Sequence, residues 1–204
     1  MSVAQTIGSA VRSIAHQLEQ VGIDGAMGEA QLIIGHVLGR SRSGIIGNKD
    51  QELSMAQLKR CRSLSKRRSA CEPIAYITGE KEFWSLPFIV SRETLIPRPD
   101  SETLVSAVLD QAEKTKTPKR LLDIGTGTGC LLAALLSEWP AATGIGIDIS
   151  EGAVDTARQN LGMLNLLERG IIVAAEWPFY QTQEKFDLVI ANPPYIPSAV
   201  IASL

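Results

Sequence analysis

Four residues near the end of the chain, Asn192-Pro193-Pro194-Tyr195, have types and spacing suited to chemistry on a planar nitrogen. An amide or aromatic-amine nitrogen is a poor nucleophile because its lone pair is delocalised. Two acceptors, one for each N–H, would direct the lone pair at an electrophile. The Asn192 side-chain oxygen and the Pro193 carbonyl can be these acceptors, and Tyr195 offers a ring face to the planar group. The tetrapeptide predicts methyl transfer to nitrogen; its structural alternative is a strand ended by prolines and an aromatic plug.

A glycine-rich turn precedes it in the chain, Asp123-Ile124-Gly125-Thr126-Gly127-Thr128-Gly129, after a short apolar run. Glycines at these positions let the backbone turn sharply and approach a ligand closely. Asp148 follows Asp123 by 25 residues, at the end of the next apolar run, where a carboxylate can accept hydrogen bonds from ribose hydroxyls. The pair predicts a nucleotide-like cofactor. The alternatives are a tight strand-to-helix turn and a carboxylate at a helix N-terminus.

The charge of Asp123 favours one cofactor over another. A carboxylate at the strand end, before the turn, would repel a pyrophosphate but attract a cation. S-adenosyl-L-methionine carries a sulfonium and an α-ammonium and has no phosphate, so we expect it in place of NAD. Glu176 and Trp177, after the third apolar run, fit an adenine contact, with a loop tryptophan packed on the core as the alternative. The expected cofactor residues are Asp123, Gly125, Thr126, Gly127, Gly129, Asp148, Glu176, Trp177 and Asn192.

The elements that position these residues alternate between strand and helix from Arg120 onward. After a helix over 100–113, the expected order is strand 121–124, helix 130–139, strand 144–149, helix 153–166, strand 171–175 and strand 186–191. Such alternation predicts right-handed crossovers and a parallel sheet with helices on both faces. Ligands bind such sheets at the carboxyl ends of the strands, where every candidate site residue lies.

The sequence pattern of the first part of the chain predicts helices. Apolar residues recur every three or four positions from Val3 to Leu18, a second helix over 32–38 ends at Gly39, and a third begins at Ser54 and closes before Pro73. Aromatic and β-branched residues mixed with turn formers between Pro73 and Pro99 predict a β-hairpin linker. We therefore expect a helical substrate-recognition domain over 1–72, the linker over 73–99 and a catalytic domain over 100–204.

Composition limits the class of protein. The chain has 204 residues, of which 45% are hydrophobic, and this is enough to build the cores of one α/β domain and a smaller one. Its net charge of −2 gives no global attraction to nucleic acid or membrane. The longest apolar runs are too short to span a bilayer, so we expect a cytoplasmic protein with no membrane partner. Three cysteines without CxxC spacing support neither a disulfide framework nor a zinc site, and no metal is expected.

One local cluster of positive charge stands out, formed by Arg60, Arg62, Lys66, Arg67 and Arg68. Charge runs on helices are commonly solvated faces. A contact with an acidic partner or with ribosomal RNA is the functional alternative.

Further motifs extend the pattern: Glu72-Pro73-Ile74-Ala75-Tyr76-Ile77-Thr78-Gly79-Glu80 with Phe83-Trp84, and Leu95-Ile96-Pro97-Arg98-Pro99-Asp100-Ser101-Glu102. With the glycine turn and Asn192 to Tyr195, they resemble the HemK/PrmC family over essentially the whole chain. The resemblance implies an α/β, Rossmann-like class I methyltransferase with a small N-terminal helical bundle and a hairpin linker. It also implies S-adenosylmethionine as cofactor and methylation of the glutamine in the GGQ motif of peptide chain release factors. Asn192, Pro193 and Tyr195 would be catalytic, and Asn192, Pro193, Pro194 and Tyr195 would hold the glutamine.

The sequence departs from the family at several points. Asp100-Ser101-Glu102 stands where Glu-Thr-Glu is usual, and Glu176 replaces an Asp. Family members continue for several strands beyond Tyr195, whereas this chain ends nine residues later, so we expect a C-terminally incomplete catalytic domain with strand 186–191 as an unpaired edge. The alternatives are an adenine or guanine amino methyltransferase on nucleic acid and a non-catalytic fragment. The hairpin signature and the lack of a broad basic surface favour the release-factor enzyme.

Overall fold

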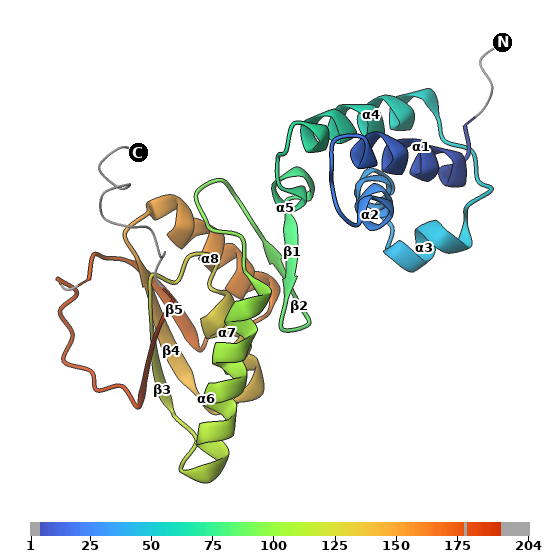
Figure 1. The fold of residues 1–204 in the computed structure, drawn as a ribbon. Helices are drawn as coiled ribbons and strands as arrows, with labels where there is room; N and C mark the ends of the chain where they lie inside the picture. Colours follow the sequence, from blue (N-terminus) through green and yellow to red (C-terminus); the bar gives the residue numbers. More distant parts are fainter. Residues whose placement is uncertain (1–4, 178, 193–204) are drawn as a thin grey trace. The chain divides into compact units, whose positions relative to one another are not determined.

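A computed structural model describes residues 5–177 and 179–192, and Figure 1 shows its fold. The chain divides into two compact units, residues 1–79 and 80–204. The first is helical, and the second contains both sheets. In the part of the chain that the structure describes, no helix combines the length and the apolar character needed to cross a bilayer.

The described residues of the first unit form five helices, α1 (Ile7–Glu19), α2 (Ala26–Leu38), α3 (Arg42–Gly47), α4 (Met55–Ser69) and α5 (Ile74–Thr78). Helix α4 begins with a capping box, in which Ser54 and Gln57 exchange side-chain to backbone hydrogen bonds. Helix α2 ends at Gly39, whose φ of 62° suits a left-handed C-cap. The helices bury a shared apolar core that includes Ile7, Leu18, Ile33, Ile34 and Ile45.

Two short helices differ from the sequence prediction. Helix α3 was not expected, and residues 74–78 form helix α5 where the hairpin linker was expected to begin. In α5, Pro73 stands at the N-cap, Gly79 ends the helix in the left-handed region, and Ala75 and Ile77 are buried. A helix of five residues is too short to display a helical period, so capping and burial determine its structure.

The hairpin itself is present, and it belongs to the second unit. Strands β1 (Glu80–Phe83) and β2 (Leu86–Ile89) pair antiparallel across a turn in which Trp84 and Ser85 have φ values of 51° and 56°. Positive φ at both positions is the mark of a type I′ turn. The rings of Phe83 and Phe88 meet edge to face at 6.3 Å and are fully buried, which fastens the hairpin to the core of this unit.

The main sheet confirms the predicted parallel arrangement. It contains β3 (Arg120–Ile124), β4 (Thr143–Asp148), β5 (Gly170–Ala174) and β6 (Leu188–Ala191), in the order β5-β4-β3-β6, all parallel. Helices α7 (Cys130–Glu138) and α8 (Glu151–Met163) connect consecutive strands. The chain runs from β3 outward to β5 and then returns to place β6 on the other side of β3. This reversal creates a switch point between β3 and β6, a preferred ligand position in open α/β sheets.

The two faces of this sheet are covered differently. Helices α6 (Glu102–Lys114), α7 and α8 pack on one face, around a core that includes Leu121, Leu132 and Leu161. On the other face, Leu122, Ile145 and Ile147 pack against side chains such as Tyr180 and Phe186. These two residues belong to the connection between β5 and β6, which runs on the side of the sheet away from α7 (Figure 1). The expectation of helices on both faces is therefore wrong for the described residues. Successive right-handed crossovers in one direction put their helices on one face, and the returning connection forms no helix.

Candidate active site

Strand register brings the candidate residues of three strands to one edge of the sheet. Ile124 pairs with Ile147 on one side and with Ala191 on the other. The next residue of each strand segment is Gly125, Asp148 and Asn192, respectively. The glycine turn therefore lies between Asp148 and Asn192 at the carboxyl ends of the strands, as the sequence predicted.

The glycine turn is fixed to the end of β4 by backbone hydrogen bonds. The N–H groups of Gly125 and Thr126 both donate to the Ile147 carbonyl at 2.9 Å. The Gly127 N–H donates to Asp148 Oδ2 at 2.9 Å, while Asp148 Oδ1 accepts from the Ser150 N–H at 3.0 Å. Asp148 thus links the turn to the start of α8, and each of its oxygens keeps a second lone pair for a ligand hydroxyl.

Asp123 is a buried acid beneath this turn. Its Oδ2 accepts a hydrogen bond of 2.7 Å from Thr126 Oγ1, and its Oδ1 is buried without a hydrogen-bond partner among the described residues. Burial raises the pKa of Asp123 to about 6, although the Thr126 hydroxyl and the nearby Leu132 N–H act in the opposite direction. An unpaired carboxylate oxygen at this depth is suited to a cationic neighbour.

The glycines of the turn have two different roles. Gly125 and Gly127 have φ values of 69° and 54°, and a Cβ at either position would project into open space. A Cβ on Gly129 would instead lie 3.2 Å from side-chain atoms of Ala157 and Leu161, so Gly129 allows α8 to pack closely. The open space above Gly125 and Gly127, beside the acid Asp123, fits a ligand that approaches the backbone and carries positive charge. S-adenosylmethionine fits both conditions.

Asn192 is positioned by a residue far away in the sequence. Its Nδ2 donates a 2.8 Å hydrogen bond to Ser101 Oγ. Ser101 lies at the end of the short helix η1 (Pro99–Ser101), and its own N–H donates to the Arg98 carbonyl. The neighbouring Glu102 accepts the Trp84 N–H of the hairpin turn at 2.9 Å. The amide of Asn192 is consequently oriented with its nitrogen toward η1.

The remaining predicted site residues are less well placed or lie outside the described residues. Glu176 and Trp177 follow the end of β5 and are both exposed, and Trp177 lines a groove with Leu122 and Tyr180 that includes no residue of the glycine turn. Their adenine contact therefore stays a prediction. Pro193, Pro194 and Tyr195 fall outside the described residues.

Asn160, which the sequence patterns did not single out, is a fully buried amide on the core side of α8. Its Nδ2 donates to the carbonyls of Thr128 and Ile89, at 2.9 and 3.0 Å, and its Oδ1 accepts the Ile89 N–H at 2.7 Å. It thus joins the glycine turn to the hairpin. A signal was available, because Asn160 shares the helical face of Ala153, Ala157 and Leu161, where a polar residue needs partners.

The three cysteines lie in different surroundings. Cys61 and Cys130 are buried and Cys71 is exposed, and all three are free thiols. Burial raises the pKa of Cys130 to about 12, so this thiol stays protonated beside the turn and is a poor nucleophile.

The parallel sheet, its switch point and the glycine turn over a buried acid define a Rossmann-like domain suited to S-adenosylmethionine, and comparison with known proteins identifies the class as methyltransferase. Residues 88–201 match the family model "Methyltransferase small domain", and residues 9–79 match "PrmC N-terminal domain". The chain belongs to the release factor glutamine methyltransferase family.

Three proteins named "Release factor glutamine methyltransferase" illustrate this membership. The one from Bradyrhizobium diazoefficiens is 41% identical over 98% of this chain and 68% of its own length. That from Vibrio cholerae is 41% identical over 94% of this chain and 66% of its length, and that from Escherichia coli K12 is 40% identical over 82% and 60%. The matched region thus spans roughly two thirds of the length of these relatives.

Proposed function

We propose that this chain transfers a methyl group from S-adenosylmethionine to the side-chain nitrogen of the glutamine in the GGQ motif of peptide chain release factors. The observation that carries the proposal is the strand register, which puts Asn192 beside the glycine turn. The names of its relatives support glutamine as the acceptor. A cytoplasmic location, where translation termination takes place, is part of the same proposal.

The chemistry assigns distinct tasks to the residues of the site. When bound, S-adenosylmethionine supplies an electrophilic methyl group on its sulfonium. Asn192 and the Pro193 carbonyl accept the two N–H groups of the glutamine amide, which directs the nitrogen lone pair toward that methyl. Tyr195 and Pro194 bound the planar amide. The new nitrogen–methyl bond forms as the sulfur–methyl bond breaks, and the nitrogen then releases a proton to Asn192 or to water, so no strong base is required.

The cofactor residues act separately from these. The backbone of Gly125 and Gly127 gives access to the turn, Asp148 accepts from the ribose hydroxyls, and Asp123 faces the positive charge. Thr126 holds Asp123 in place through its hydroxyl. We assign Glu176 and Trp177 to the adenine. Residues 1–72 are proposed to recognise the protein substrate.

The test is an assay with methyl-labelled cofactor, offering a release factor and an RNA in parallel. It is run with the chain of 204 residues and with a form extended by the C-terminal segment of a relative. Asn192→Ala is expected to reduce turnover by about 100-fold or more, since aligning the reactants is worth several kcal/mol, while cofactor binding measured by calorimetry is retained.

Two results would contradict the proposal. Near-normal turnover of Asn192→Ala would remove the role given to this amide. Methyl transfer to RNA, with the release factor untouched, would place the chain among the nucleic-acid amino methyltransferases. A release factor whose GGQ glutamine is replaced serves as the matched substrate control.

A further inference from the structure

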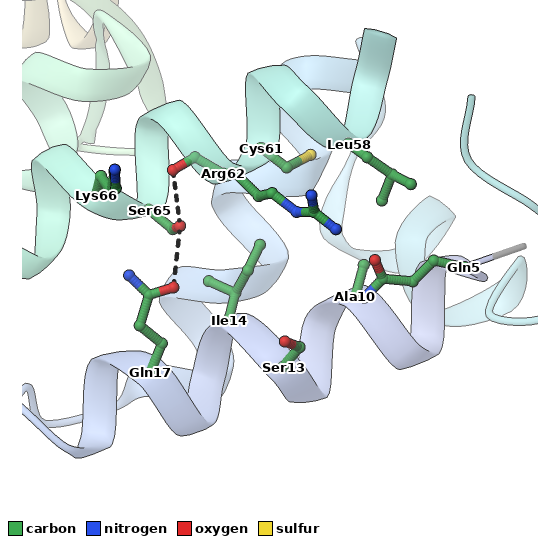
Figure 2. Close-up of a pocket in the computed structure, with 10 residues that line it drawn as sticks. All are labelled: Gln5, Ala10, Ser13, Ile14, Gln17, Leu58, Cys61, Arg62, Ser65 and Lys66. Atoms are coloured by element: carbon green, nitrogen blue, oxygen red, sulfur yellow. Dashed lines mark hydrogen bonds between the residues drawn. The ribbon is translucent and has the colours of Figure 1, made fainter. Parts of the chain in front are cut away.

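A groove lies between α1 and α4, and all the residues that line it belong to the helical unit (Figure 2). Its volume is about 410 Å³, within the range of sites that accept a few side chains of a ligand. Two buried apolar residues, Ile14 and Leu58, lie along it, together with the buried thiol of Cys61. The polar lining comes from Gln5, Ser13, Gln17 and Ser65.

Two cations face this groove without a counter-charge. Arg62 and Lys66, one turn apart on α4, line it and are exposed, and neither forms an ion pair within the described residues. In residues 5–177 and 179–192, no Asp or Glu lines the groove. Figure 2 shows the guanidinium of Arg62 lying between α4 and α1, while Gln17 and Ser65 are joined by a hydrogen bond.

The other arginines of the basic cluster behave differently. Arg67 forms a two-pronged pair with Glu72 at 2.7 Å, and Arg68 pairs with Glu29. Both pairs join parts of the helical unit to each other, so these two charges are internally balanced. Within the predicted cluster, Arg67 and Arg68 are therefore structural, whereas Arg62 and Lys66 are available to a partner.

The wider charge distribution has the same sign. Residues 1–79 contain ten Lys and Arg against six Asp and Glu, whereas the whole chain has a net charge of −2. Helix α4 alone carries six Lys and Arg and no Asp or Glu. An acidic partner would be attracted to this unit in particular.

We propose that the groove between α1 and α4 binds an acidic segment of a partner protein, in which an apolar side chain is flanked by carboxylates. The apolar side chain contacts Ile14 and Leu58, and the carboxylates pair with Arg62 and Lys66. A protein segment fits better than RNA, because none of the described residues that line the groove is aromatic and could stack against a base. This surface is a second contact site, separate from the residues assigned to methyl transfer.

The experiment uses the whole chain and a short fluorescent peptide with a central Leu between Glu residues, followed by anisotropy. The double variant Arg62→Glu with Lys66→Glu should weaken binding by about tenfold or more, the result of reversing two charges at once. The matched control is Lys59→Glu with Arg60→Glu, which makes the same charge change on α4 outside the groove. It should weaken peptide binding by about threefold at most. Circular dichroism checks that the variants fold. The double variant Arg62→Gln with Lys66→Gln removes both charges without reversing them and should weaken binding less.

Several results would contradict the proposed binding site. Equal losses in the two Glu variants would mean diffuse attraction and overturn the site. Equal binding of a peptide with Gln in place of Glu would exclude charge recognition. Absence of peptide binding, or tighter binding of a single-stranded RNA of the same charge, would also refute an acidic protein segment. Methyl transfer is not measured in this experiment, so its failure can be distinguished from failure of the methyl-transfer assay.

Discussion

Asp123 makes the stability of the protein depend on pH. Its pKa is about 6 in the folded chain against an ordinary value of 3.8, so the folded state binds the proton more tightly than the unfolded state. The stabilising contribution is fully present below about pH 4 and is lost as the pH rises through about 6. Asp123→Asn should therefore raise the free energy of unfolding at pH 7 by on the order of 2 kcal/mol, with little gain at pH 4.

Urea denaturation of both proteins at a series of pH values, without cofactor, measures this difference. A gain of equal size at pH 4 and pH 7 would show that ionisation of Asp123 is not its cause. The same variant should bind S-adenosylmethionine more weakly at pH 7, because it lacks the negative charge proposed to attract the sulfonium.

Ser101 is expected to act through Asn192. Ser101→Ala removes the acceptor of the Asn192 Nδ2 hydrogen bond and should lower single-turnover rates by about tenfold, the equivalent of one lost hydrogen bond. Ser101→Thr keeps a hydroxyl and should retain most of the rate. Cofactor affinity should be unchanged in both. If Ala and Thr variants have equal rates, the hydroxyl has no positioning role.

At the scale of elements, the hairpin carries a residue in an unfavourable conformation. Ser85 is exposed at φ 56°, in the left-handed region that favours glycine. Ser85→Gly should therefore stabilise the protein by about 0.5 kcal/mol, after allowance for the greater entropy of glycine in the unfolded chain. Thermal unfolding measures the change, with Ser85→Ala as the control that keeps a Cβ. A lower melting temperature for the Gly variant would contradict it.

Elements with strong local signals were predictable, and those fixed by tertiary contacts were not. The residues Asp123 to Gly129 and Asp148 predicted β3, the turn and β4, because their spacing and the backbone freedom of glycine are local features of the sequence. Ser101 and Asn192 are 91 positions apart, and no local pattern records their hydrogen bond. The face of the sheet chosen by each helix depends likewise on the path of the whole chain.

At the scale of the molecule, β6 forms an edge of the sheet in the described residues. It pairs with β3 alone, and Val189 is 54% exposed. An apolar edge strand favours pairing between copies, so the chain of 204 residues should self-associate at micromolar concentration. Light scattering should show this, and Val189→Lys should reduce it. A monomer that persists on concentration would mean that this edge is covered.

Asn160 also bears on the order in which the second unit folds. Its hydrogen bonds to Ile89 join residues 71 positions apart, so this attachment of the hairpin forms only after α8 has reached the sheet. The Ile89 amide then exchanges with solvent deuterium only when α8 separates from the hairpin. One buried side chain thus makes the cofactor turn and a distant hairpin a single cooperative unit.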